Sequence, residues 1–197
     1  MRQFLALALS EQMRRDIGRI APRLPALGAW RWIAPASVHL TLRFLGEVGP
    51  DLDEVARPGW ARAAAGVEPF CFRLGRLGCF PRGGQPRVLW VAVREQSGRL
   101  AALAAALEQS ARDSGFVPVE RAFRPHLTLA RVRGSNRGLR PDPEDAGCER
   151  EEKASEVVLF RSLLGPDGAR YTALASFPLG GRGDRGAAGD RTGARAE

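Results

Sequence analysis

The chain has 197 residues, of which 44% are hydrophobic and 26% charged, a composition typical of a soluble globular domain and not of a disordered or fibrous chain. No stretch approaches the ~18 consecutive apolar residues of a transmembrane helix, which argues against a membrane protein. The formal net charge of +8 at pH 7 favours an anionic partner such as RNA, although an arginine excess is also what a GC-rich genome produces.

The first half of the chain predicts strands that alternate with helices. Met13, Ile17 and Ile20 have helical spacing and follow Ser10, a preferred N-cap residue. The expected elements are a strand over Arg2–Leu9, a helix from Ser10 that Pro22 and Pro25 end, a strand over Val38–Leu45 and a helix over Leu52–Ala65.

The second half predicts two strands around a Gly/Pro-rich loop, a long helix, a further strand, a polar loop and a hairpin. The expected ranges are Phe70–Leu77 and Arg87–Val93 around Gly78–Pro86, a helix from a Ser97 cap to Ser114, Phe123–Val132, Gly134–Glu151, and the hairpin strands Glu156–Leu164 and Arg170–Pro178. No large apolar residue follows residue 179, so we expect one folded domain over residues 1–179 and a disordered Gly/Arg-rich tail over residues 180–197.

The two histidines of the chain lie in identical words, His39-Leu40-Thr41-Leu42 and His126-Leu127-Thr128-Leu129. A single His-x-Thr word is most often a surface pair or a half-buried structural histidine. Two copies that include every histidine, in a chain whose remaining threonines are Thr172 and Thr192, argue against coincidence. The repeated HxTx word is therefore the main candidate for a functional motif.

The chemistry of the words favours acid–base catalysis on a phosphodiester. Strand side chains alternate between faces, so the histidine and threonine of each word share one face and the leucines the other. Imidazole titrates near neutral pH and serves as a general acid or base, while hydroxyls donate to phosphate oxygens. Zinc ligand spacings such as H-E-x-x-H or C-x-x-C are lacking, so neither metal nor cofactor is expected.

One motif in each half predicts an α+β fold. We expect two pseudo-symmetric lobes whose antiparallel sheets face a central cleft, with one HxTx strand per lobe and the two histidines across the cleft from each other. Histidine side chains on unrelated surfaces would exclude a mechanism that uses both.

The words and their neighbours resemble the 2H phosphoesterases, and within them the bacterial RNA 2′,3′-cyclic phosphodiesterases, also called the 2′-5′ RNA ligase family. The resemblance runs from about residue 2 to residue 179. Its residues are Arg2–Leu9, Val38–Gly46, Phe80-Pro81, Pro86–Trp90, Phe123–Arg131, and Ser162-Leu163-Leu164 followed by Gly168 and Tyr171.

The resemblance implies a role for each motif residue. His39 would be the proton donor to the leaving O3′ and His126 the base that activates water. Thr41 and Thr128 would hold the non-bridging phosphate oxygens, and the product would be a 2′-phosphomonoester. Because the two words are identical, the residues themselves do not distinguish acid from base.

Five residues after each histidine, the two segments differ in a residue that could contact a substrate, Phe44 in the first and Arg131 in the second. An arginine pairs well with phosphate, and the resemblance supports Arg131 as a phosphate contact. Strand alternation places this offset on the opposite face, so a bulge or a strand end would be needed for Arg131 to reach the motif face. Phe44 is either a base-stacking residue or a core residue beside Leu42 and Leu45.

Other basic and aromatic residues flank the motifs. Arg31, Arg43, Arg124 and Arg133 are candidates to guide an RNA backbone. The tryptophans near the motifs, Trp30, Trp32 and Trp90, are more typical of core packing than of base stacking.

The expected function is hydrolysis of terminal 2′,3′-cyclic phosphates on RNA 3′ ends, for example tRNA fragments, by a cytoplasmic, metal-independent monomer. An absent signal-peptide pattern and the irregular spacing of Cys71, Cys79 and Cys148 predict the location. The alternatives within the superfamily are a 2′-5′ RNA ligase, a 2′-5′ oligonucleotide phosphodiesterase or a small cyclic-nucleotide phosphodiesterase. A different class is a non-catalytic RNA-binding module, against which the intact histidines argue.

Overall fold

The computed structural model describes residues 1–20, 22, 30–81, 85–132, 150–165 and 168–180. In these ranges three helices and a short 3-10 helix accompany nine strands. The helical segments are α1 (Glu11–Gly18), η2 (Pro35–Ser37), α2 (Pro50–Ala65) and α3 (Arg99–Asp113). The strands are β1 (Arg2–Leu7), β2 (Trp30–Trp32), β3 (Leu40–Glu47), β4 (Phe70–Phe80), β5 (Val88–Arg94), β6 (His126–Val132), β7 (Glu151–Ala154), β8 (Glu156–Gly165) and β9 (Gly168–Pro178).

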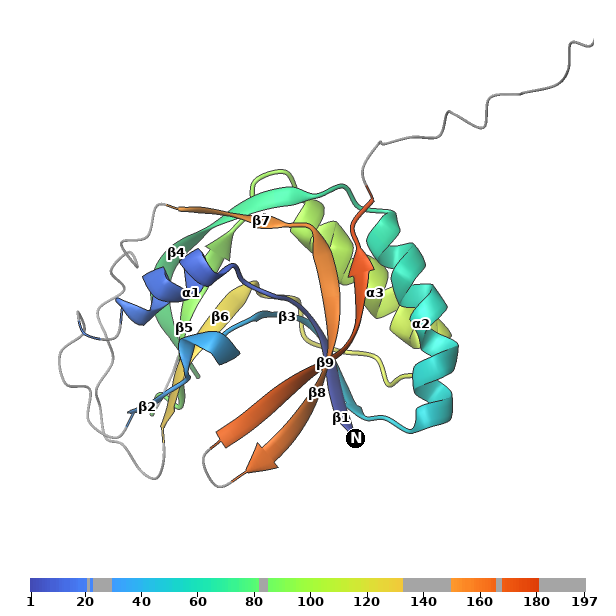
Figure 1. Cartoon of the computed structure of the whole chain (residues 1–197), viewed down its shortest axis with the longest axis horizontal. Helices are drawn as coiled ribbons and strands as arrows, with labels where there is room; N and C mark the ends of the chain where they lie inside the picture. Colours follow the sequence, from blue (N-terminus) through green and yellow to red (C-terminus); the bar gives the residue numbers. More distant parts are fainter. Residues whose placement is uncertain (21, 23–29, 82–84, 133–149, 166–167, 181–197) are drawn as a thin grey trace, which may run out of the picture.

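The strands form one curled antiparallel sheet with the order β7-β4-β5-β6-β3-β1-β8-β9, and β2 pairs with β6 beside this path. Figure 1 shows the curl, with β4 and β5 at the left of the view and β8 and β9 running through its centre to the lower edge. The predicted α+β fold with antiparallel strands is therefore confirmed, and the two halves are joined edge to edge in a continuous sheet.

The sheet order is symmetric about the contact between β3 and β6. Strands β1, β8 and β9 follow β3 on one side, and β5, β4 and β7 follow β6 on the other. The contact itself pairs Leu40 with Leu127, the same position in the two HxTx words. Antiparallel strands that pair equivalent residues are related by a local twofold axis at that pair, as the repeated motif predicts.

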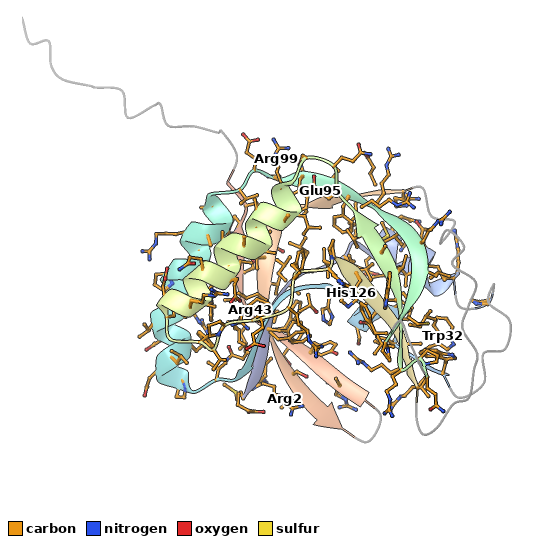
Figure 2. All side chains as sticks on the ribbon, turned by 180° about the vertical axis from the view of Figure 1, so that it is seen from behind. Arg2, Trp32, Arg43, Glu95, Arg99 and His126 are labelled. Carbon is orange, nitrogen blue, oxygen red and sulfur yellow. The ribbon has the colours of Figure 1, made fainter. Side chains whose placement is uncertain are left out.

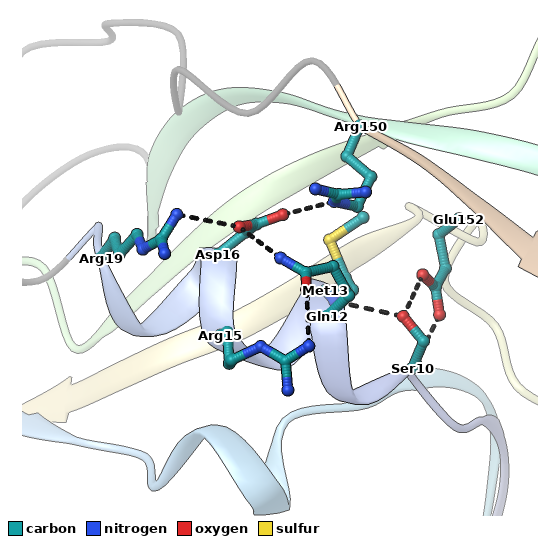
Figure 3. A network of polar contacts seen from close by, with 8 residues as sticks. All are labelled: Ser10, Gln12, Met13, Arg15, Asp16, Arg19, Arg150 and Glu152. Carbon is teal, nitrogen blue, oxygen red and sulfur yellow. Dashed lines mark hydrogen bonds and ion pairs between the residues drawn. The ribbon is translucent and has the colours of Figure 1, made fainter.

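The helices cover the face of the sheet opposite the motif histidines. Helix α2 packs against α3 and β9, and α3 packs against β3. Helix α1 lies over β4, β5 and β6 of the other half (Figures 1 and 3). The motif leucines Leu40, Leu42, Leu127 and Leu129 are buried in one cluster with residues of all three helices, which fixes the opposite face of each motif strand as the one that faces away from the core.

Helix α1 begins at Ser10, as the sequence predicts. The Ser10 hydroxyl accepts a hydrogen bond from the Met13 N–H at 3.1 Å and donates to Glu152 Oε2 on β7 at 2.7 Å. The Ser10 N–H donates to Glu152 Oε1 at 2.5 Å, and Arg150 pairs with Asp16 at 2.6 Å (Figure 3). These contacts fasten α1 to the outer strand of its half of the sheet.

Several element boundaries differ from the predicted ones. The cap of α3 is Gly98 at φ 78° and not Ser97, because the Glu95 carboxylate accepts hydrogen bonds from the N–H groups of Ser97 and Leu100. Strand β4 continues through Gly78 to Phe80, which shortens the predicted loop. Strands β2 and β7 were not predicted.

Parts of several predictions lie outside the described residues. These are the tail from residue 181, Arg133 and Cys148 with most of the polar loop, residues 82–84 of the Gly/Pro-rich loop, and Pro25. Among the described helices, none has the length and apolar character that crossing a membrane requires.

Candidate active site

The two HxTx words meet at the centre of the sheet. Leu40 pairs with Leu127 in an antiparallel ladder, so the same register places His39 next to Thr128 and Thr41 next to His126. All four polar side chains lie on the face opposite the buried leucines. Electrostatics agree with this placement, because the His126 charge contributes to lowering the pKa of His39. The structure thus brings the two predicted histidines and two predicted threonines together.

Each histidine is held by the same backbone contact. His39 Nδ1 lies 2.9 Å from the carbonyl oxygen of Ser37, and His126 Nδ1 lies 2.6 Å from that of Arg124. A carbonyl oxygen accepts, so Nδ1 carries the proton in both rings. The Nε2 atoms are therefore the nitrogens that can exchange protons with a substrate, and neutral imidazole presents a base there.

A β-bulge interrupts each motif strand at the last leucine of the word. In β3, Arg43 pairs with Leu5 and Thr41 with Ala6, so Leu42 is the extra residue. The equivalent bulge in β6 is at Leu129, between the pairs Ala130–Leu89 and Thr128–Trp90. Each bulge shifts the alternation by one residue. The side chains five residues after each histidine consequently lie on the motif face.

Phe44 and Arg131 occupy these equivalent positions. Phe44 is 62% exposed, so the alternative that it is a core residue is wrong; its ring centroid lies 5.9 Å from that of Phe4. Arg131 is exposed, and its charge acts on His39 and Tyr171. The bulge that the offset of Arg131 requires is therefore present.

His39 lies among aromatic rings from β1, β8 and β9, the strands on its own side of the sheet. Its ring stacks on Phe4 with centroids 4.6 Å apart and meets the edge of Tyr171 at 4.9 Å and the tilted ring of Phe160 at 6.1 Å. Phe4 is buried, and Phe160 pairs with it across β1 and β8. Sequence reasoning assigned no site role to Phe4 or Phe160, because their approach to His39 depends on how β1 pairs with β3 and β8.

His126 has a different aromatic surround. Phe80 meets its ring edge-on at 5.3 Å and Trp90 at 6.2 Å. The Trp90 ring lies over Gly78, where an added Cβ would come within 2.4 Å of the indole. Trp90 is thus a neighbour of the motif histidine on the motif face. Figure 2 shows His126 between the two halves of the molecule.

Burial lowers the pKa of His39 below its ordinary value, with smaller contributions of the same sign from the charges of Arg131 and His126, while the hydrogen bond to Ser37 acts in the opposite direction. Burial also raises the pKa of Tyr171, so its hydroxyl stays protonated near neutral pH and can donate a hydrogen bond. Free His39 is therefore predominantly neutral at pH 7.

Arg43 does not lie on the motif face, contrary to the suggestion that it guides RNA. Its side chain is 6% exposed and forms a 2.5 Å ion pair with Glu108 of α3. Its guanidinium also donates to the carbonyl oxygens of Val117, at 2.6 Å, and Phe44. Because the bulge at Leu42 places two consecutive side chains on the core face, Arg43 points toward α3 (Figure 2).

In the described part of the chain, no cluster of three His, Cys, Asp or Glu side chains has the arrangement of a metal site. The site therefore consists of two anchored imidazoles, two hydroxyls, one guanidinium and flanking aromatic rings. Such a set can transfer protons at two positions around one anionic group.

The family model of the 2′-5′ RNA ligase superfamily matches residues 14–139, which include both HxTx words. The chain belongs to the 2′-5′ RNA ligase superfamily. A protein named RNA 2′,3′-cyclic phosphodiesterase from Archaeoglobus fulgidus is 31% identical over 185 residues, covering 90% of this chain and 99% of that protein.

Two solved structures have the same fold as this chain. A crystal structure of a Thermus thermophilus protein is similar with a TM-score of 0.81 and 30% identity, covering 93% of this chain and all (100%) of that one. Escherichia coli LigT in complex with 3′-AMP is similar with a TM-score of 0.74 and 29% identity, covering 90% of this chain and 97% of LigT. The similarity to these structures therefore covers nearly the whole fold and not only the two HxTx words.

Proposed function

We propose that this protein is an RNA 2′,3′-cyclic phosphodiesterase, which hydrolyses a terminal 2′,3′-cyclic phosphate to a 2′-phosphomonoester. The decisive observation is that both HxTx words present a histidine and a threonine on one face, with each Nδ1 bonded to a backbone carbonyl. The name and full-length similarity of the Archaeoglobus fulgidus protein support this function, and the 3′-AMP complex of E. coli LigT supports a nucleotide end as the ligand.

The mechanism uses the two histidines as acid and base. His126 Nε2 removes a proton from water as its oxygen attacks phosphorus, and protonated His39 Nε2 donates to O3′ as the P–O3′ bond breaks. The proton that water loses remains on His126, and the 2′ oxygen keeps the phosphate. Thr41, Thr128 and Arg131 donate hydrogen bonds to the non-bridging oxygens, whose negative charge grows in the transition state.

This assignment requires protonated His39, although burial lowers its pKa in the free protein. A bound phosphodiester brings a negative charge next to the ring, and an opposite charge favours the protonated form. Substrate binding and protonation of His39 are therefore coupled. The reaction should be favoured on the acidic side of neutrality at low substrate concentration, where more free protein has His39 protonated.

Phe44 is the residue we propose to stack on the terminal base, and its exposed ring beside Phe4 on the motif face supports this role. We further propose that the physiological substrates are RNA 3′ ends such as those of tRNA fragments. The protein would act on them as a monomer in the cytoplasm, without a metal ion or other cofactor.

The test is hydrolysis of a short RNA that ends in a 2′,3′-cyclic phosphate, in the presence of EDTA. Wild type should produce a terminal 2′-phosphate, and His39→Ala and His126→Ala should each reduce kcat by about 10²–10⁴-fold, the usual contribution of a general acid or base. Arg62→Gln, at an exposed position of α2, is the control for a remote substitution.

Two results would contradict this proposal. Wild-type turnover that EDTA abolishes would replace the two-histidine mechanism by a metal-dependent one. Binding of RNA without turnover would favour a binding module or another linkage, and 2′-5′-linked oligonucleotides would then be the next substrate.

A further inference from the structure

Strand β2 places a second arginine directly beside Arg131. The register of β2 on β6 pairs Trp30 with Val132, Arg31 with Arg131 and Trp32 with Ala130. The backbone N–H of Ile33 continues the pairing by donating to the Leu129 carbonyl at 2.8 Å. Arg31 and Arg131 are therefore directly opposed residues of an antiparallel pair.

Directly opposed residues share a face of the sheet, so Arg31 lies on the same face as Arg131. The bulge at Leu129 makes this the motif face. Trp30 is buried in the core cluster on the other face of the sheet. Because successive strand residues point to opposite faces, this agrees with Arg31 on the motif face. Figure 2 shows Trp32, and hence the end of β2, displaced from His126 toward the edge of the molecule.

Two like charges in directly opposed positions destabilise a sheet unless an anion lies between or beside them. In the described part of the chain neither Arg31 nor Arg131 forms an ion pair, whereas Arg43, Arg57 and Arg73 each pair with a carboxylate. Local rules of stability are typically broken in this way where a protein binds a ligand. Both guanidinium groups are permanently charged, so the pair can balance two negative charges, whereas a cyclic phosphodiester has one.

We propose that Arg31 binds the backbone phosphate on the 5′ side of the terminal nucleotide while Arg131 contacts the reacting cyclic phosphate. This inference rests on the proposed function and deepens it to substrate length. The opposed Cα atoms of an antiparallel pair are about 4.5–5.5 Å apart, and long side chains that diverge from there reach two successive phosphates of one strand. The site therefore recognises an oligonucleotide end in preference to a mononucleotide.

The test compares two substrates and one substitution. For Arg31→Gln, kcat/KM should fall about tenfold on a ribodinucleotide ending in a 2′,3′-cyclic phosphate and stay within about twofold of wild type on a mononucleoside 2′,3′-cyclic phosphate, since only the first has a backbone phosphate. Arg31→Lys keeps the positive charge, so its loss of kcat/KM on the dinucleotide should be smaller than that of Arg31→Gln. Arg62→Gln makes the same charge change on α2 and should leave kcat/KM unchanged on both substrates.

Two further measurements separate binding from folding and from catalysis. Removal of one member of a like-charged pair should leave Tm unchanged or raise it, and should reduce the slope of log affinity against log salt for a single-stranded RNA by about 0.7. Affinities for a nucleoside 2′-phosphate and for the corresponding dinucleotide, measured by calorimetry, repeat the comparison without turnover.

Equal losses on the mononucleotide and dinucleotide would place Arg31 at the reacting phosphate and overturn the proposal, as would no loss on either. If wild type turns over neither substrate, the proposed function fails. The calorimetric comparison still decides the role of Arg31 in that case.

Discussion

His39 and His126 have the same backbone contact but different surroundings. Phe4 stacks on His39, with Tyr171 and Phe160 as further ring neighbours, and burial lowers its pKa. The identical words thus become chemically distinct through residues from β1, β8 and β9. The words alone do not distinguish the acid from the base. A pH titration of each histidine in the folded protein can make that assignment.

The lowered pKa of His39 predicts a pH dependence of stability. Its ordinary value is 6.5, so just below this pH the unfolded chain binds a proton that the folded protein does not. The contribution of neutral His39 to stability is therefore complete above pH 6.5 and is lost as the pH falls from 6.5 toward the folded-state pKa. In denaturant unfolding experiments, the free energy of unfolding should decline less steeply for His39→Gln than for wild type as the pH falls from 7.5 to about 5.

A histidine NMR titration gives the same information directly. Resonances of His39 should titrate below pH 6.5 in the free protein and shift to higher pH when a nucleoside 2′-phosphate binds. A titration at or above 6.5 in the free protein would contradict the role of burial.

At the scale of elements, the α1 cap predicts a measurable loss of stability. Ser10→Ala removes the acceptor of the Met13 N–H and a donor to Glu152, whose side chain is buried at 4% exposure. The free energy of unfolding should fall by about 1–2 kcal/mol, as for other lost N-caps. Ser97→Ala is the matched control, because Gly98 caps α3 and the Ser97 hydroxyl donates only an exposed hydrogen bond, to Glu95. Its cost should be below about 0.5 kcal/mol. Equal losses in chemical denaturation would contradict the capping role of Ser10.

The Ser10 cap and the shared face of the HxTx words could be predicted because both follow from local rules. A cap depends on its own first turn, and strand alternation depends on neighbouring residues. The positions of Phe44 and Arg131 could not be predicted in this way. They depend on bulges at Leu42 and Leu129, which arise from pairing with β1 and β5, far away in sequence.

The remaining differences also come from non-local or competing contacts. Glu95 displaces Ser97 from its predicted capping role by accepting the hydrogen bonds at the start of α3. The three residues of β2 are a strand only because they pair with β6. The aromatic surroundings of His39 likewise combine three strands, and no spacing within the chain reveals that combination.

At the scale of the whole molecule, one ion pair links the first motif to the segment that leads to the second. Arg43 of β3 pairs with Glu108 of α3 and donates to the Val117 carbonyl, while Glu108 accepts from the Val119 N–H at 2.9 Å. Residues 117–125 then continue into His126. The position of one motif strand relative to the other is therefore coupled to a pair whose side chains are 6% and 20% exposed.

Glu108→Gln should lower the free energy of unfolding by about 3 kcal/mol, because it leaves the charge of Arg43 buried without its partner. Although burial raises the pKa of Glu108, hydrogen bonds from Arg112 and Val119 and the charge of Arg43 hold it below 4.5. Wild type should therefore keep this stabilisation above pH 4.5 and lose it as the pH falls through the folded-state pKa, a dependence that the variant lacks.

The coupling between the halves is tested by activity under conditions where the variants are folded. If the pair sets the relative position of the two histidines, Glu108→Gln should lower kcat on the cyclic phosphate more than it raises KM, since misplaced acid and base groups affect the transition state most. Arg112→Gln removes only the exposed partner of Glu108 and should cost less than about 1 kcal/mol with kcat unchanged. An unchanged kcat in Glu108→Gln would show that the pair stabilises the fold without positioning the motif strands.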